Sequence, residues 1–206
     1  MDLEIFIKLK NIHEILKFGG FNLDTMGILI GSRNSQIFFK FLSYIYDRIN
    51  PHIYTSDMRD TLLNDITGER LLDVGVGTGY TTKHLSYAVG IDLSRDMLQR
   101  AKSEYKGYLV LGDASSAPFK SNSFDTIICA GSLYYFNSPE AAVRGFKRLL
   151  KRDGTILTIT PNWPILGIFV HIFKKIDLQR IFHDADMRLE KIQNMRGIAY
   201  YCKARR

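Results

Sequence analysis

The sequence predicts an α/β protein whose mostly parallel β-sheet carries helices on both faces. From residue 69 onward, short apolar runs of strand length alternate with segments of helical periodicity, which is the pattern of parallel strands connected by helices. The first run leads into a turn that carries Gly75, Gly77 and Gly79 at alternate positions. Open α/β sheets bind ligands at the carboxyl ends of their strands. The two observations together favour one sheet with a ligand site along one edge.

Residues 1–68 are expected to form a helical extension or lid ahead of the sheet. Apolar residues recur at helical spacing in residues 3–17, and further helices are expected over 35–49 and 55–68. The second of these is apolar on most sides and stops at Pro51. A helix of that composition must be buried, cover a ligand or touch a membrane.

Seven strands are expected in the domain formed by residues 69–206. Each is a short apolar run bounded by turn-forming or charged residues. The last two flank Arg196-Gly197 and are expected to pair as a terminal hairpin. The expected strands are residues 69–74, 88–92, 108–111, 124–130, 155–160, 188–193 and 198–202.

Four helices are expected to connect these strands, over residues 79–87, 95–105, 138–151 and 164–183. Ser94 precedes the second and suits an N-cap. Ser138-Pro139 opens the third as a cap followed by a proline at the first helical position. The apolar segment 163–183 is expected to be a helical insertion that, with residues 35–54, covers the ligand site.

Composition indicates an ordinary globular protein of one domain with a modest appendage. The chain has 206 residues, 46% of them hydrophobic, and a net charge of +7. Its basic residues are scattered, which makes nucleic-acid binding an unfavoured use of this charge. Cys129 and Cys202 are isolated and lack metal-ligand spacing, so no metal site and a reducing, cytoplasmic compartment are expected. No apolar run reaches the ~20 residues of a transmembrane helix.

The glycine turn distinguishes between two kinds of cofactor. A dinucleotide site has the spacing G-x-G-x-x-G, whereas this chain has G-x-G-x-G with Tyr80 in place of the third glycine. Asp73, two residues before Gly75, would repel a pyrophosphate but could hold an ammonium group. The inferred ligand therefore carries both a cation and a carboxylate, as the methionine end of S-adenosylmethionine does.

Acidic residues end three consecutive expected strands. Asp73 ends the first and Asp92 the second, where a carboxylate can accept hydrogen bonds from both ribose hydroxyls. Asp113 follows the third and could accept from an adenine amino group. The fourth ends at Ala130-Gly131-Ser132, where small residues let a ligand lie against the backbone. Each acid alone could be a cap, but three beside one glycine turn indicate a site.

The order of these features resembles the class I S-adenosylmethionine-dependent methyltransferases, in particular the branch of the ubiquinone/menaquinone-biosynthesis C-methyltransferases. The resemblance covers about residues 44–162. It rests on Asp73 to Gly79, Gly90-Ile-Asp-Leu-Ser94, Gly112-Asp113-Ala114 with Pro118-Phe119, Ser123-Phe-Asp-Thr-Ile127 and Leu149-Leu-Lys-Arg-Asp-Gly-Thr155. It implies a Rossmann-like sheet whose last strand is antiparallel, S-adenosylmethionine as cofactor, and methyl transfer to a small molecule.

The expected site residues follow from these strand ends and from the resemblance. The cofactor would contact Tyr46, Asp73, Gly75, Gly77, Gly79, Asp92, Leu93, Asp113, Ala114 and Ala130. An aromatic acceptor pocket would use Tyr54, Tyr134, Tyr135 and Trp163. No catalytic residue is assigned, and the candidate bases are His52, Tyr134, His171 and His183. Tyr134-Tyr135-Phe136 stands where many relatives have a histidine pair, which argues against a histidine base there.

The expected acceptor is small and largely apolar, such as a quinol, an isoprenoid or a lipid precursor. The basic excess, with Lys8, Lys10 and Lys17 beside the first apolar stripe, allows peripheral contact with an anionic membrane. Two alternatives stay open: a nucleic-acid methyltransferase and a non-catalytic protein that binds the cofactor. Ala130 to Leu133 lacks the Asn/Asp-Pro-Pro-aromatic tetrad common in methylation of base amino groups. The oligomeric state is not predicted.

Overall fold

The computed structural model describes residues 54–162, 164 and 170–206. The helices expected over 3–17 and 35–49 therefore lie outside the described residues, as do Tyr46, His52 and Trp163. Within the described part of the chain, no helix is both long enough and apolar enough to cross a membrane.

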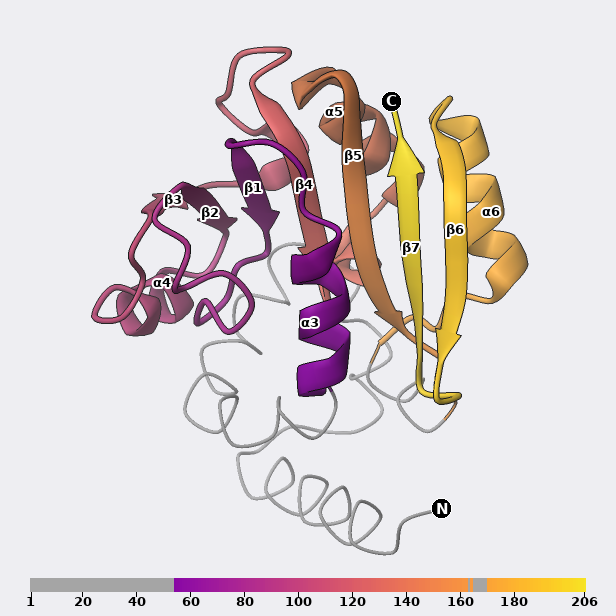
Figure 1. Ribbon diagram of the computed structural model, residues 1–206, viewed down its shortest axis with the longest axis horizontal. Coiled ribbons are helices and arrows are strands. Elements are labelled where there is room, and N and C mark those ends of the chain that lie inside the picture. Colours follow the sequence, from indigo (N-terminus) through magenta and orange to yellow (C-terminus); the bar gives the residue numbers. More distant parts are fainter. Residues whose placement is uncertain (1–53, 163, 165–169) are drawn as a thin grey trace, which may run out of the picture.

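The centre of the molecule is a seven-stranded sheet with the order β3-β2-β1-β4-β5-β7-β6 (Figure 1). Strands β1 to β5 are mutually parallel, and β7 runs antiparallel to both of its neighbours. The expected sheet with an antiparallel last strand is thus confirmed. The strands are β1 (Leu71–Val74), β2 (Ala88–Asp92), β3 (Tyr108–Leu111), β4 (Phe124–Ala130), β5 (Leu150–Pro161), β6 (Arg188–Met195) and β7 (Ala199–Arg205).

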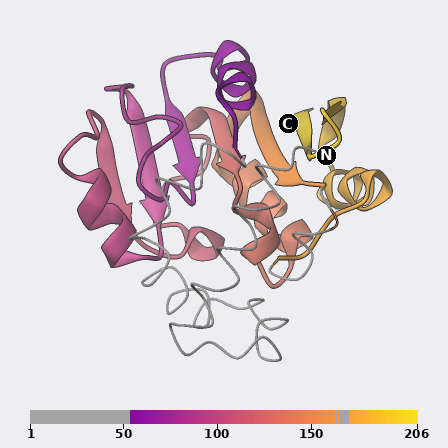
Figure 2. The ribbon, with the colours of Figure 1, turned by 90° about the horizontal axis from the view of Figure 1, so that it is seen from below.

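Helices cover both faces of this sheet, as the sequence predicts. Figure 2 shows α3 on one side and α5 and α6 on the other. Apolar side chains from α3 and α4 pack with one set of strand residues, and those from α5 and α6 pack with the other. The helices are α3 (Ser56–Asn64), α4 (Arg95–Ala101), α5 (Pro139–Leu149) and α6 (Lys175–Asp184).

Two predicted caps fix the starts of α4 and α5. The hydroxyl of Ser94 accepts from the backbone N–H of Met97 at 3.3 Å, and that of Ser138 accepts from Ala141 at 3.2 Å. Pro139 occupies the first helical position of α5. The predicted helix 95–105 ends early, since α4 stops at Ala101.

Strand residues alternate between two cores because successive side chains of a strand point to opposite faces. Leu72 and Ile127 face α5, whereas Leu71 and Ile128 face α3 and α4, and all four are fully buried. The sheet is therefore a central layer with an apolar core on each side.

The helix predicted over residues 79–87 is wrong, because this segment is a run of turns. The backbone N–H of Lys83 reaches the carbonyl of Gly79 at 2.9 Å, but the pattern does not continue into a regular helix. The Thr82 hydroxyl instead donates to the carboxylate of Asp73 at 2.7 Å. Threonine is a weak helix former whose hydroxyl readily makes local polar contacts. The glycine turn therefore lacks the helix N-terminus expected after it.

The helix predicted over 164–183 is confirmed from Lys175 onward, and residues 165–169 lie outside the described residues. Residues 171–174 have no regular structure, and α6 begins at Lys175. Leu178 and Phe182 of α6 are completely buried in the core shared with α5. Helix α6 is thus a layer of the domain, and the covering role of residues 35–54 and 163–183 stays a prediction.

The extension predicted over residues 1–68 is described from Tyr54 onward. Met58 and Leu62 of α3 are buried against the sheet. At its end, Asp65 receives hydrogen bonds from the Tyr201 hydroxyl and, at 2.8 Å, from the Lys203 ammonium. This helix therefore packs on β5 and β7.

Candidate functional site

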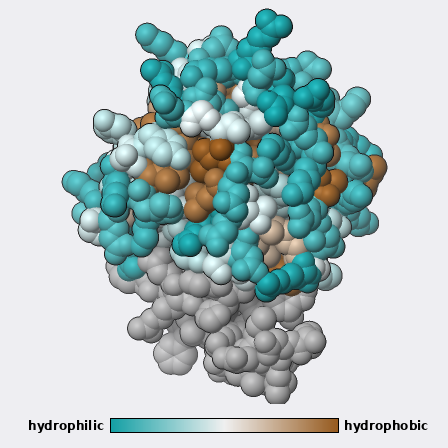
Figure 3. All heavy atoms as spheres, in the orientation of Figure 1, coloured by the Kyte–Doolittle hydropathy of each residue, from teal (hydrophilic) through white to brown (hydrophobic). Residues whose placement is uncertain are grey.

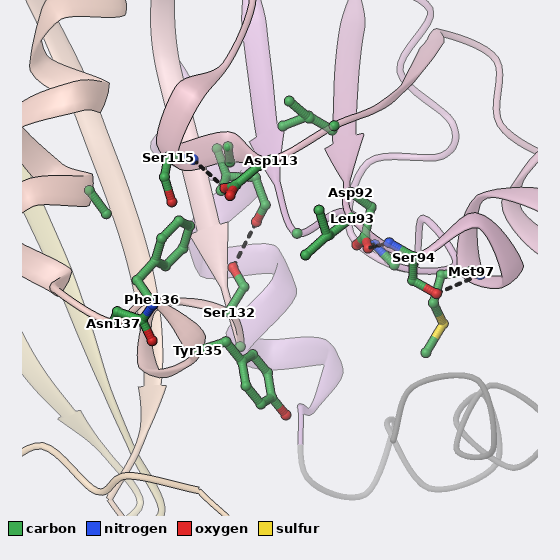
Figure 4. A pocket seen from close by; sticks show the side chains of 18 of the residues that line it. Asp92, Leu93, Ser94, Met97, Asp113, Ser115, Ser132, Tyr135, Phe136 and Asn137 are labelled. Carbon is green, nitrogen blue, oxygen red and sulfur yellow. Dashed lines mark hydrogen bonds between the residues drawn. The ribbon is translucent and has the colours of Figure 1, made fainter. Parts of the chain in front are cut away.

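A cavity of about 450 Å³ opens at the carboxyl ends of β1, β2, β3 and β4. This volume is within the range of small-molecule sites. Figure 4 shows Phe136 and Asn137 on one side of it, with Asp92, Ser94 and Met97 on the other. The lining residues are Val74, Gly75, Gly77, Ile91, Asp92, Leu93, Ser94, Met97, Gly112, Asp113, Ala114, Ser115, Gly131, Ser132, Tyr135, Phe136, Asn137, Ser138, Ala141 and Ala142.

The glycine turn forms the floor of this cavity. Gly75 and Gly77 have φ angles of +69° and +56°, in the region that favours glycine. A Cβ on Gly75 would lie 2.4 Å from the Cβ of Ser132, so a side chain there would collide with the segment that follows β4. A Cβ on Gly77 would have no neighbour nearer than 4.0 Å, which leaves this backbone open to the cavity. Gly79, with φ of +85°, does not line the cavity and instead faces the ring of Tyr105.

Asp92 connects the end of β2 to the glycine turn. One carboxylate oxygen accepts from the backbone N–H of Gly77 and the other from that of Ser94, each at 2.8 Å. Burial raises the pKa of this carboxyl, and the backbone N–H bonds oppose the shift. A partly buried carboxylate on the cavity wall is suited to accept hydrogen bonds from ligand hydroxyl groups.

Asp113 lies across the cavity at the start of the short helix η2 (Ala114–Ser116). Its carboxylate caps this helix by accepting from the backbone N–H of Ser115 at 2.8 Å. The side chain is exposed, and Figure 4 shows it at the cavity wall. One of its oxygens is thus engaged in the cap, and the other is available to a ligand amino group.

Asp73 takes a different position from the other two acids. It is almost fully buried, does not line the cavity, and accepts from Thr82, whose hydroxyl also lies 2.9 Å from that of Tyr105. Burial raises the pKa of Asp73 to about 7, opposed by the Thr82 hydrogen bond and increased by the charge of Asp92. The sequence places these acids at one edge, but Asp73 points toward the face that carries α3 and α4.

The end of β4 is fixed to the end of β1 by Ser132. Its hydroxyl donates to the Val74 carbonyl at 2.7 Å and lies 3.1 Å from the thiol sulfur of Cys129. Gly131 has a φ of +69° and lines the cavity together with Ser132, whereas Ala130 does not. Small residues thus leave the backbone accessible to the cavity at this strand end, but from Gly131 onward rather than at Ala130.

The predicted aromatic pocket is divided between two places. Tyr135 lines the cavity, and the ring of Tyr134 packs against the ring of Tyr135 with centroids 4.4 Å apart. Burial raises the pKa of Tyr134 to about 12, so its phenol stays protonated near neutral pH. Tyr54 lies instead against Tyr80, the residue after the glycine turn, at 5.6 Å between ring centroids.

The described candidate bases other than Tyr134 lie away from the cavity. His171 packs edge-on against Phe173 at 4.7 Å, and His183 is an exposed residue of α6 whose Nδ1 lies 3.1 Å from the Asp184 carboxylate. Neither lines the cavity. Phe136, Asn137 and the small residues Ala141 and Ala142 do line it, although sequence reasoning did not select them.

A family model described as a methyltransferase domain matches residues 72–158. The matched segment, residues 72–158, is called the methyltransferase domain below, after the description of that model. This domain spans β1 to β5 and contains every acid and glycine of the cavity.

Curated relatives of the methyltransferase domain include enzymes named for quinone-type substrates. The 2-methyl-6-phytyl-1,4-hydroquinone methyltransferase 2 of Oryza sativa subsp. japonica, a chloroplastic protein, is 36% identical over 141 residues. The alignment covers 62% of this chain and 40% of that relative. The demethylmenaquinone methyltransferase of Staphylococcus haemolyticus is 31% identical over 153 residues, covering 66% of this chain and 64% of that relative. The chain thus spans about 40% of the length of the first of these relatives.

Solved structures confirm the fold of the methyltransferase domain. A methyltransferase of Thermotoga maritima, described as S-adenosylmethionine-dependent and as a possible histamine N-methyltransferase, superposes with a TM-score of 0.70. The match covers 82% of this chain and 98% of that one at 18% identity, so it shows the fold alone.

The family and these fold neighbours imply S-adenosylmethionine as the cofactor. The cavity fits this molecule in the hydrogen-bond acceptors that it presents and in the open space at the glycine turn. Asp92 and Asp113 present acceptors to hydroxyl and amino groups, and Gly77 leaves space in which a side chain would otherwise stand. Leu93 and Met97 add apolar surface for a flat ring.

Proposed function

We propose that this protein transfers a methyl group from S-adenosylmethionine to a small, largely apolar acceptor of the quinol type. The observation that carries the proposal is the cavity in which Asp92, Asp113 and the open glycine turn meet at the strand ends of a methyltransferase domain. Relatives named for hydroquinone and demethylmenaquinone methylation support the acceptor class.

Each residue of the cavity has a distinct part in holding the cofactor. Asp92 would accept from the ribose hydroxyls, exchanging its present bond to Gly77 for ligand bonds. Asp113 would accept from the adenine amino group with the oxygen that does not cap η2. Leu93 and Ala114 would contact the base, and Gly75, Gly77 and Gly131 would let the ligand approach backbone.

The cofactor supplies an electrophilic methyl group, so the protein is left with binding, orientation and the exclusion of water. Tyr135 and Phe136 contribute an apolar wall at the open side of the cavity. Tyr134 is protonated near neutral pH and would serve as a hydrogen-bond donor rather than as a base. The proposal therefore relies on an acceptor that becomes nucleophilic by losing its own acidic proton, as a phenol does when it ionises to a phenolate.

The cysteines and the surface support a proposal on the surroundings of the protein. Cys129 and Cys202 are both unpaired and buried, which supports a reducing compartment such as the cytoplasm. The face that carries α3 is mainly hydrophilic (Figure 3), so contact with a membrane would have to use another surface. Lys8, Lys10 and Lys17 are the residues through which we expect peripheral contact.

The test is a transfer assay with the methyl group of the cofactor labelled. Matched panels would offer hydroquinones with prenyl side chains, RNA, DNA and protein. Label in the hydroquinone panel supports the proposal, and label confined to nucleic acid contradicts the acceptor class. The Asp92→Ala variant is the matched control, since it should lose transfer in every panel.

A further inference from the structure

Strand β3 has an uncharged outer edge. It ends the sheet next to β2, and no strand of the described residues pairs with its other side (Figure 1). Its sequence, Tyr-Leu-Val-Leu, contains neither a charge nor a proline. Tyr108 and Leu111 are exposed by 71% and 48%, although most large apolar side chains of a folded domain are covered. An exposed apolar edge of this kind is a template on which another strand can pair.

The opposite edge of the same sheet is built differently. Strand β6 carries Arg188, Glu190 and Lys191, all exposed. Charged side chains on an edge strand keep other strands from adding to it. The sheet therefore protects the β6 edge and leaves the β3 edge suited to pairing.

The backbone of β3 presents hydrogen-bonding groups on its outer side. The N–H of Gly112, directly after the strand, donates inward to the Asp92 carbonyl of β2 at 2.9 Å. Successive residues of a strand in a parallel pair direct their backbone groups alternately to the two sides. The N–H and carbonyl groups of Leu109 and Leu111 consequently point away from β2, in a row of donors and acceptors.

We propose that this edge pairs with the same edge of a second copy of the chain, in antiparallel direction, so that one sheet continues across a two-fold axis. Leu109 of each copy would lie opposite Leu111 of the other, and their outward N–H and carbonyl groups would satisfy one another. Val110 would lie opposite its own counterpart, which is a favourable β-branched pair. This dimer does not depend on the proposed function.

The charges beside β3 favour the antiparallel direction. Lys106 precedes the strand and Asp113 follows it, and both are exposed. Antiparallel pairing brings the basic end of one copy toward the acidic end of the other, whereas parallel pairing brings like charges together. Two-fold symmetry also closes the assembly, because the same residues serve both copies. A contact built on one short strand is small, so we expect a dissociation constant of about 1–100 μM.

The first experiment is sedimentation velocity of the full chain at concentrations below and above this range, with hydrogen exchange read by NMR on the same samples. A dimer should form as concentration rises. The amides of Leu109 and Leu111 should then exchange at least about tenfold more slowly, because pairing removes them from water. A monomer at every concentration overturns the inference, as does a dimer in which these two amides exchange as in the monomer.

The second experiment separates strand pairing from general surface effects with three variants. Leu111→Pro removes an outward donor and no bond to β2, and edge strands tolerate proline in such a place. Tyr108→Lys introduces a charge at an exposed position that does not contribute to the core. Ile176→Lys is the matched control, since Ile176 is an apolar residue of α6 exposed by 57%.

Leu111→Pro and Tyr108→Lys should each raise the dissociation constant of the dimer at least about tenfold, and Ile176→Lys should leave it unchanged. Thermal unfolding checks that each variant is folded, and Tyr108→Lys decides the question if the proline variant is not. Unchanged association of Tyr108→Lys contradicts the inference, and so does an equal loss in Ile176→Lys.

Discussion

The carboxylate of Asp92 accepts a hydrogen bond of 2.8 Å from the backbone N–H of Gly77. This bond joins the end of β2 to the glycine turn after β1, across the floor of the cavity. The same carboxylate is the group that we propose as the acceptor for the ribose hydroxyls. In the free protein, the Asp92 carboxylate therefore stabilises the conformation of the glycine turn, and the same carboxylate is proposed to bind the cofactor.

Asp92→Ala should weaken binding of S-adenosylhomocysteine by about 1–3 kcal/mol, because ligand donors would lose their acceptor. Calorimetry measures this directly. Asp96→Ala is the control, since Asp96 is an exposed residue of the same region that does not line the cavity. Equal affinities for the Asp92 variant and the control would contradict the assignment.

Gly75→Ala and Gly77→Ala should differ sharply in stability. Both positions have positive φ, which costs an alanine about 1–2 kcal/mol. At Gly75 the added methyl also collides with Ser132, so the loss should exceed 3 kcal/mol, roughly the strain plus overpacking. At Gly77 the methyl enters open space, so stability should fall only by the strain while cofactor binding weakens. Urea unfolding and calorimetry separate the two effects, and equal losses of stability would contradict the geometry.

Asp73 should make the free protein less stable as pH rises. Burial raises its pKa in the folded protein to about 7, whereas an aspartate in an unfolded chain titrates near pH ~3.9. The folded state then binds more protons than the unfolded state between these values, so the free energy of unfolding falls as pH rises through this window.

The measurement for Asp73 is urea unfolding of the unchanged protein and of Asp73→Asn at two pH values. One is pH 5, about one unit inside the window, and the other is pH 8, about one unit above it. The variant should lose this contribution to the pH dependence, since an amide does not titrate. The same pH dependence in both proteins would show that other groups produce it.

Tyr201→Phe should destabilise the protein by about 1–2 kcal/mol, because the hydroxyl of this fully buried residue donates to Asp65 at the end of α3. The pKa of Asp65 is held low against its burial by Lys203 and Tyr201, which indicates that the carboxylate is charged in this contact. Thermal or urea unfolding measures the change. Tyr200→Phe is the control, since its hydroxyl makes no hydrogen bond within the described residues, and equal losses would contradict the role given to Tyr201.

The bounds of a strand could be predicted closely where turn-forming or charged residues stand at both ends of an apolar run. The bounds of β2, β3 and β4 are those predicted. Strand β5 begins at Leu150, five residues before the predicted start at Thr155. The predicted start is late because Asp153-Gly154 has the sequence of a turn. In the structure the pairing of β4 with β5 shifts register between Phe124 and Thr126, which accommodates this irregular stretch within a continuous strand.

The site could be predicted where it lies directly at strand ends, and not where it depends on packing. Asp92, Leu93, Asp113 and Ala114 line the cavity because they follow parallel neighbouring strands. Phe136 and Ala142 reach it through the path of the chain from β4 to α5, which no local pattern specifies.

Strand β7 lies between β5 and β6, although it follows both in the chain. During synthesis, β6 therefore leaves the ribosome before its hydrogen-bonding partner exists, while β1 to β5 can already pair. Arg196 and Gly197 both have positive φ and form the turn that reverses the chain after β6. The reversal places β7, residues 199–205, between β5 and β6. A nascent chain stalled before Ala199 would therefore leave β5 and β6 without the strand that pairs with both, and would expose their unpaired edges to other chains on the polysome.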